Sequence, residues 1–351
     1  MNTSYNDFQL TEEQVNSLKR TVQERKVAEY IKANGVEPDA ETFQSFFAAT
    51  AEQLEMRRRS IYALMYQPEG HDYSQDYLTL VMLDNGSSIR TEDDFIKFSK
   101  DEGQTWVSEL TGLVAGDRVL MKGEIKDHVW DVYGGSYGGS YYGFCDWENT
   151  GRFNVEGNIL SIYDSTGFTS ITSLYEAEDL LAYVFSGTSV VSAENLVLPL
   201  TQLNEGCYAY MFAGCSSLTT APSILPATTL AKGCYDSMFS DCTGLTAAPA
   251  LPVTSLTDSC YAYMFQGCTE LTTAPELPAT TLAQNCYQNM FYGCTNLNYI
   301  KCLATNISAS DCTYDWVYNV ASTGTFVKAP GMTSWTTDTN GIPTGWTVEN
   351  A

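Results

Sequence analysis

Cysteine is the chemically reactive residue type that recurs most regularly in this sequence. Eleven cysteines are present, and eight of them form two columns in a repeated C-Y-x-x-M-F-x-x-C motif. The four copies of the motif begin at Cys207, Cys234, Cys260 and Cys286. Cysteines can form disulfides, bind a metal or pack as buried thiols. Because degenerate copies carry Thr188 and Val320 in the second column, the pattern favours buried thiols, with disulfides and a metal site as alternatives.

Other catalytic chemistry has little support in the sequence. Only two histidines are present, His71 and His128, and both lie outside the repeats. The chain lacks the H-E-x-x-H, P-loop and G-x-G-x-x-G motifs that position zinc or phosphates. Paired acids such as Asp93-Asp94 could support glycosidic chemistry, but an acidic surface produces such pairs by chance. We therefore expect no enzymatic activity, no cofactor and no metal.

The charge of the 351-residue chain excludes several classes of partner. There are 18 lysines and arginines against 42 aspartates and glutamates, a formal net charge of −24. Such a surface repels phosphate backbones and anionic lipids, so binding to nucleic acid or to a membrane surface is not expected. The sequence contains no run of 18 apolar residues, so it does not predict a membrane-spanning segment. The N-terminus shows no basic-then-apolar signal pattern, so we expect no export by the ordinary routes.

Three regimes of composition predict three domains, residues 1–67, 68–150 and 151–351. The first domain has helical periodicity on both sides of Asn34-Gly35 and predicts a helical hairpin. Such a hairpin is too small to bury both of its faces alone. We expect it to serve oligomerisation or anchoring, with a helical cap on the next domain as the alternative.

The second domain, residues 68–150, predicts a small all-β, sandwich-like fold because short alternating runs at 77–83, 95–99 and 117–122 stand between turn signals. Within it, residues 99–106 match the S-x-D-x-G-x-T-W pattern of the Asp-box, a hairpin-forming device found in sialidases and other propellers. A β-domain of this length is too short for a propeller. Residues 132–143 follow, a run of tyrosine, glycine and serine that is either a binding loop or a linker.

The third domain is a repeat array. The motif recurs with periods of 27, 26 and 26 residues, and degenerate copies at 182–187 and 312–317 flank the regular ones. Atypical ends around regular middles are typical of a stacked repeat protein. Apolar residues at i, i+4 and i+5 predict a short helix with glycine as its C-cap, followed by a short strand with one inward leucine. These elements make the expected fold class multidomain α+β.

The repeats resemble the BspA-like branch of leucine-rich repeats. The resemblance rests on segments such as CYAYMFAGCSSLTTAPSILPATTL and CYAYMFQGCTELTTAPELPATTL and covers roughly residues 150–351. It is closest to the tandem form found in surface and phage-encoded proteins of gut Bacteroides-type bacteria. The resemblance implies a curved leucine-rich-repeat solenoid used for adhesion or for protein and glycan recognition, without catalysis. Asp241 replaces the usual glycine, so we expect one distorted turn.

Positions that vary between repeats predict the contact surface, because invariant positions hold a repeat fold together. We expect the ligand-binding strip to consist of Tyr210, Asp236, Tyr263 and Asn289. A second repeated column contains Tyr208, Tyr235, Tyr261 and Tyr287. This column favours partly buried packing over a ligand platform.

The expected function is that of a non-enzymatic phage virion structural protein, a fibre, spike or decoration protein used for host attachment. Its expected partners are other virion proteins, bound through the N-terminal helices, and a host surface protein or glycan, bound through the repeats. A homotrimer made in the host cytoplasm and incorporated into the virion fits this layout. The alternative is a bacterial cell-surface adhesin or interaction protein.

Overall fold

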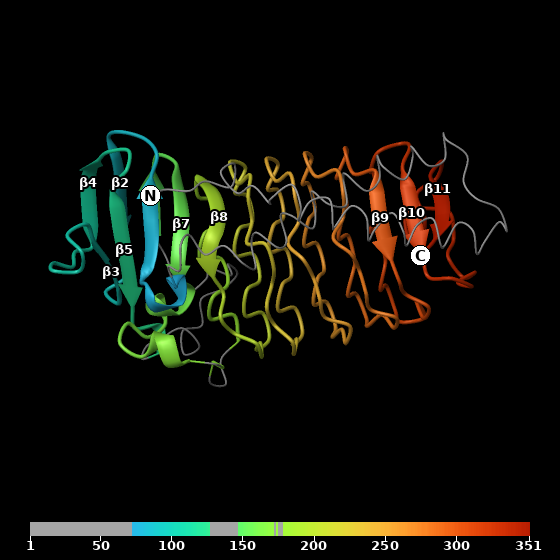
Figure 1. Cartoon of the computed structure of the whole chain (residues 1–351), viewed down its shortest axis with the longest axis horizontal. Helices are drawn as coiled ribbons and strands as arrows, with labels where there is room; N and C mark the ends of the chain where they lie inside the picture. The colour runs from blue at the N-terminus through green and yellow to red at the C-terminus, as the bar shows by residue number, and fades with distance from the viewer. Residues whose placement is uncertain (1–71, 127–146, 172, 175–177) are drawn as a thin grey trace, which may run out of the picture. The chain divides into compact units, whose positions relative to one another are not determined.

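The computed structural model describes residues 72–126, 147–171, 173–174 and 178–351 (Figure 1). The chain divides into two compact units, Met1–Asp72 and Tyr73–Ala351, and all the described residues except Asp72 belong to the second. The helical hairpin expected in residues 1–67 lies outside the described residues. So do the tyrosine- and glycine-rich segment 132–143 and both histidines. The predicted domain boundaries remain predictions.

The predicted α+β fold class with a leucine-rich-repeat solenoid is wrong. The described residues form β-strands, turns and three short 3₁₀ helices, and they include no complete α-helix. The strands belong to one five-stranded and two three-stranded sheets. Residues 198–298, the centre of the repeat array, contain no strand and only isolated bridges such as Gln202↔Thr229 and Ile224↔Ala250. A leucine-rich-repeat solenoid would have a continuous parallel sheet there.

The first part of the unit is built from two sheets. The five-stranded sheet has the order β3-β5-β1-β7-β8, and the smaller sheet has the order β4-β2-β6. The elements are η3 (Tyr73–Gln75), β1 (Leu78–Met82), β2 (Ser87–Thr91), β3 (Ile96–Ser99), β4 (Glu109–Leu113), β5 (Arg118–Gly123), β6 (Trp147–Thr150), β7 (Phe153–Asn158), η4 (Ile159–Ile162), η5 (Phe168–Ser170) and β8 (Val190–Val197). A third sheet of β9 (Tyr299–Cys302), β10 (Thr325–Lys328) and β11 (Thr347–Asn350) ends the chain.

The Asp-box forms a hairpin that begins in β3 and is closed by an antiparallel bridge between Phe98 and Val107. Asp101 accepts hydrogen bonds from the backbone N–H of Thr105 (2.9 Å) and the hydroxyl of Ser99 (2.7 Å). The hydroxyl of Thr105 also donates to Asp101, at 2.6 Å. This bond, followed by the other two, lowers the pKa of Asp101 to about 2. Glu102 and Gly103 take positive φ angles of 58° and 83° to close the turn. The motif is therefore a structural turn here.

The first sheet continues directly into the repeats. Strand β8 pairs in parallel with β7, and Ser192 of β8 forms a bridge to Thr220 in the first regular repeat. Figure 1 shows the stacked turns between β8 and β9. The indole N–H of Trp147 in β6 donates to the carbonyl of Val184 at 2.8 Å, and its ring packs edge-on against Phe185. Sheet and repeats thus share one hydrophobic core.

The C-Y-x-x-M-F segments are stacked turns, and the short helix expected there is absent. Every fourth residue has a positive φ, as in Gly206 (61°), Tyr210 (57°) and Gly214 (75°). Backbone N–H groups alternate: Tyr208 donates to the carbonyl of Cys234 in the next repeat, whereas the preceding Cys207 donates within its own turn to Asn204. An α-helix sends every N–H to the residue four positions earlier. A left-handed residue at every fourth position prevents that pattern.

The turn at Asp241 is regular, contrary to the expected distortion. Asp241 adopts a φ of 57°, and its N–H donates to the carbonyl of Gln266 at 2.7 Å, as Gly214 does to Ser240. Aspartate tolerates the left-handed region better than most residues because its short side chain bonds locally. It therefore substitutes for glycine without disturbing the stack.

Two columns of aromatic rings run through the repeat core. Phenylalanine rings stack at centroid distances of 5.2–5.8 Å, in the order Phe185, Phe212, Phe239, Phe265 and Phe291. The predicted tyrosine column also stacks, at 5.8–6.3 Å, and its rings are buried. Those tyrosines are therefore packing residues. Trp316 closes both columns, because it contacts Tyr287 and Phe291 together.

The cysteines complete the same core. All ten cysteines in the described residues are buried free thiols, which confirms that interpretation for these ten. In the second column each thiol donates to the phenylalanine carbonyl of the preceding repeat: Cys242 Sγ lies 3.0 Å from the Phe212 oxygen. Burial raises the pKa of Cys215 to about 11 and that of Cys294 to about 12. These thiols are hence protonated donors and poor nucleophiles at neutral pH.

The phenol of Tyr235, in the tyrosine column, lacks a hydrogen bond. Its Oη is buried and has no partner among the described residues. Replacing Tyr235 with phenylalanine removes this unsatisfied group, so we expect the free energy of unfolding to rise by about 1 kcal/mol. Urea denaturation of the purified protein measures the change.

The matched control is Tyr77→Phe. The hydroxyl of Tyr77 donates to the carbonyl of Ser165 at 3.2 Å, so its removal is expected to lower the free energy of unfolding by a similar amount. Equal destabilisation by both substitutions would mean that Tyr235 has a partner in solution.

Candidate functional site

Side chains that differ between repeats gather on one edge of the stacked turns, which we call the variable edge. It consists of Tyr183, Tyr210, Asp236, Ser237, Tyr263, Gln288, Asn289 and Tyr314. Ser237 is buried, Tyr314 is exposed, and the other six are half-buried. The edge presents aromatic rings together with carboxyl, hydroxyl and amide groups, which is the composition of a recognition surface.

The four residues predicted as a strip all lie on the variable edge, in two adjacent columns. Tyr210, Tyr263 and Asn289 share one column, and each has a positive φ between 52° and 57°. Asp236 belongs to the neighbouring column, because the N–H of Tyr210 donates to the Asp236 carbonyl at 2.8 Å. The residue of the first column in that turn is Ser237. Whether the four residues bind a ligand stays a prediction.

The tyrosines of the edge have different surroundings. Tyr183 and Tyr210 stack with ring centroids 4.7 Å apart and planes 2° from parallel. The hydroxyl of Tyr263 accepts a hydrogen bond from the Gln288 amide at 3.2 Å. Burial, and next the negative charge of Asp236, raise the pKa of Tyr263. Asp236 and Tyr263 therefore lie close together.

Asp236 is the unusual carboxylate of the array. Its only side-chain hydrogen bond comes from the hydroxyl of the adjacent Ser237, at 2.6 Å, and no ion pair joins it to a described residue. Burial raises the pKa of Asp236 to about 6. Two other acids of the array have a lysine from the next turn: Lys232 contacts Glu205 at 2.5 Å, and Lys301 contacts Glu276 at 3.0 Å.

Asn289 also carries an unsatisfied polar atom. Its side-chain oxygen is buried and has no hydrogen-bond partner among the described residues. Its left-handed backbone, with a φ of 52°, fits asparagine, which visits this region more readily than most residues other than glycine. The side-chain amide itself has no role in the fold that the contacts reveal.

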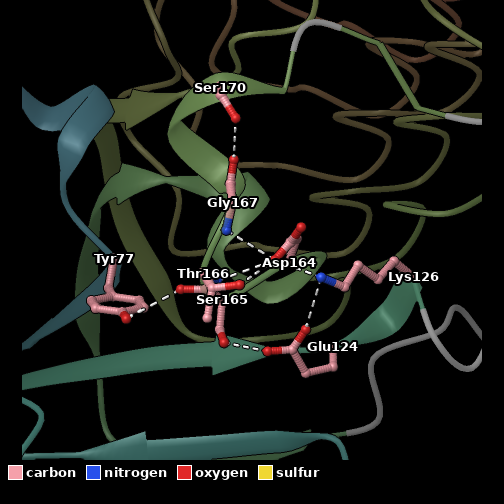
Figure 2. A network of polar contacts seen from close by, with 8 residues as sticks. All are labelled: Tyr77, Glu124, Lys126, Asp164, Ser165, Thr166, Gly167 and Ser170. Atoms are coloured by element: carbon pink, nitrogen blue, oxygen red, sulfur yellow. Dashed lines mark hydrogen bonds and ion pairs between the residues drawn. The ribbon is translucent and has the colours of Figure 1, made fainter.

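A second polar cluster lies just after the end of β5, beside the turn that follows η4 (Figure 2). Lys126 lies 2.7 Å from Asp164, and the hydroxyl of Ser165 donates to Glu124. Burial would raise the pKa of Asp164, but bonds from Lys126 and from the backbone N–H groups of Gly167 and Thr166 lower it to about 2. The bond to Asp164 raises the pKa of Lys126.

This cluster has no catalytic chemistry. A lysine held protonated by a carboxylate is no general base, and Ser165 is buried with its hydroxyl already donated to Glu124. The carboxylate of Asp164 accepts bonds from Thr166 and Gly167 at 3.1 and 2.9 Å, which fixes the turn between η4 and η5. The cluster is therefore a structural lock.

The remaining features give no further site. A hollow of about 420 Å³ lies beside Val317 and Thr344, and Asp338 is the one ionisable residue that lines it. No group of three or more histidine, cysteine, aspartate or glutamate side chains in the described ranges could hold a metal ion. Within the same ranges, no helix has the length and apolar character that crossing a bilayer requires.

Comparisons with protein-family models, with curated proteins and with solved structures gave no match. The resemblance to BspA-like repeats therefore remains an expectation from the sequence. The case for a function has to rest on the variable edge itself.

Asp236 predicts a pH dependence of stability. The folded state raises its pKa from 3.8 to about 6, so it favours the protonated form. The stabilisation of the fold by the protonated carboxyl is fully present below pH 4 and is lost as the pH rises through 6. The full loss lowers the free energy of unfolding by about 3 kcal/mol. We expect Asp236→Asn to unfold at higher urea concentration than the wild type at pH 7.5, and at a similar concentration at pH 4.

Glu270→Gln is the control, because Glu270 is an exposed acid of the same array. In this variant, the difference between the urea midpoints at pH 7.5 and pH 4 should be the same as in the wild type. If the gain from Asp236→Asn is the same at both pH values, the carboxyl does not titrate as the structure implies.

Proposed function

We propose that this chain is a non-enzymatic recognition protein that binds a surface partner through the variable edge of its repeats. The observation that carries the proposal is the half-buried Asp236, which has no ion pair with any described residue and lies between turns bearing Tyr210 and Tyr263. Burying a carboxylate without a counter-charge costs stability. A residue kept at such a cost, on the part of the repeat that varies, is best explained by binding.

The stiffness of the array supports the same proposal. Each turn of the variable edge is fixed by backbone hydrogen bonds to both neighbouring turns and by the stacked rings beneath. Side chains on such a scaffold lose little conformational entropy on binding, because their positions are already set. A rigid row of tyrosines and polar groups suits attachment to another molecule.

We propose further that the protein is carried on a phage particle, as a fibre, spike or decoration protein that attaches to the host surface. This rests on the likeness of its repeats to phage-encoded and surface proteins. The alternative, a bacterial cell-surface adhesin, uses the same edge. Immunogold labelling of gradient-purified phage particles with antibody to residues 182–351 separates the two: gold on head or tail supports the virion protein, and gold on cell envelopes alone supports the adhesin.

Replacing Tyr210, Asp236, Tyr263 and Asn289 together with alanine tests the binding edge. We expect attachment of the purified protein to cells of the producing strain to fall at least tenfold, with the melting temperature changed by only a few degrees. Flow cytometry with a labelled protein measures attachment.

The matched control replaces four exposed residues elsewhere on the same repeats, one of them an acid: Ser216, Thr243, Glu270 and Asn296. This variant should attach like the wild type. Unchanged attachment by the first variant, or equal loss by both, would contradict the proposal.

A further inference from the structure

The column that contains Tyr210 and Tyr263 is interrupted between them. The intervening residue, Ser237, has only a hydroxymethyl side chain, and no ring contact joins the two tyrosines. Successive turns are spaced like neighbouring strands, so the two tyrosines lie about 9–10 Å apart along the stack. Tyr210 stacks on Tyr183, whereas the ring of Tyr263 stacks on no other aromatic ring among the described residues. The turn between them therefore supplies a carboxylate, and the turns on either side supply a phenol ring.

We propose that Asp236, Tyr210 and Tyr263 form a binding site for the guanidinium group of an arginine on a partner protein. The site deepens the proposed function and rests on it, because it names the chemistry that the variable edge recognises. The carboxylate would pair with the cation, and the phenol rings would contact its flat faces.

Charge complementarity favours a cation. Residues 182–351 carry 3 basic and 11 acidic side chains, so the array as a whole attracts positive groups. Most of these acids are exposed and bind cations weakly, because water screens them. Asp236 differs because it is partly shielded from water and has no lysine or arginine of its own among the described residues. An ion pair formed there would be stronger than one at the exposed acids.

The neighbouring rings favour arginine among cations. A guanidinium is planar, is more weakly hydrated than an ammonium and stacks on aromatic faces while it donates two hydrogen bonds to a carboxylate. Cations within about 6 Å of a tyrosine ring gain further electrostatic attraction. A metal ion would need more oxygen ligands than this single carboxylate offers.

Below pH 6, proton release should accompany binding. The charged form of Asp236 is disfavoured by burial alone, with no contribution from a neighbouring charge, and its pKa is about 6. The other titratable groups nearby on the adjoining turns are Tyr210, Tyr263 and Tyr314, and burial followed by the charge of Asp236 raises the pKa of Tyr263. Since a cation pairs only with the ionised carboxyl, affinity should fall about tenfold per pH unit below pH 6.

The test is a titration of the full-length protein, carbon-13 labelled on its tyrosine rings, with the peptide acetyl-Gly-Gly-Arg-Gly-Gly-amide. The resonances of Tyr210 and Tyr263, assigned from Tyr→Phe variants, report the dissociation constant. The same peptide with citrulline in place of arginine keeps the shape and removes the charge. Asp236→Asn removes the carboxylate, and Glu270→Gln removes an exposed acid from the same array.

The proposal predicts saturable shifts at pH 7.5 with the arginine peptide, at least fivefold weaker binding to Asp236→Asn, and less than twofold change in Glu270→Gln. Binding should weaken at pH 5 in the wild type and in Glu270→Gln, but not in Asp236→Asn. Equal shifts with citrulline, or equal losses in both variants, would overturn the site. Attachment to cells is measured separately. Peptide binding without attachment to cells would support this site and contradict the proposed function. Attachment without peptide binding would contradict this site and leave the proposed function standing.

Discussion

The alternation of backbone hydrogen bonds is the constraint on which the repeat array depends. One N–H closes a turn within the repeat and the next reaches the following repeat, so every turn is tied to both neighbours. This arrangement requires a left-handed residue at every fourth position. Once it is in place, side chains of the same column stand one strand spacing apart. Stacked phenylalanine and tyrosine rings and the thiol-to-carbonyl ladder follow from that spacing.

The same constraint explains where variation is possible. Inward columns must hold a ring, a thioether or a thiol of matching size, whereas the outer residues mainly contact other outer residues. Tyrosine at positive φ is uncommon, yet Tyr183, Tyr210 and Tyr263 adopt values of 55–62°. Each accepts some backbone strain, which stacking offsets for Tyr183 and Tyr210. Backbone strain and an acid that has no ion pair in the described part of the chain therefore coincide on the edge that we propose to bind a partner.

Part of this structure could be predicted from the sequence. The period and the inward columns were correct because identical units must bury identical side chains, and β1, β3 and β5 lie within or overlap the alternating runs at 77–83, 95–99 and 117–122. The helix was wrong because apolar residues at i, i+4 and i+5 also suit a chain of turns. The missed signal was the column Gly206, Gly233, Ser259, Asn285 and Asp311, in which every residue adopts a positive φ and most belong to types that tolerate it. Asp236 was placed with Tyr210 because sequence spacing does not reveal which N–H crosses to the next turn, and its raised pKa depends on burial that only the fold defines.

Indole rings that belong to no regular repeat stand at both ends of the phenylalanine column. Trp147 covers one end, Trp316 and Trp335 stack at the other, and the Trp346 indole donates to Ala321 at 2.7 Å. Between these two ends, every turn contacts the next through the same backbone carbonyls, aromatic rings and thiols. A duplicated 26-residue unit would fit between any two existing units without changing the tryptophan contacts at either end. Unequal recombination within the gene would therefore lengthen or shorten the array in whole steps, adding or deleting outer positions while the interior chemistry is inherited intact.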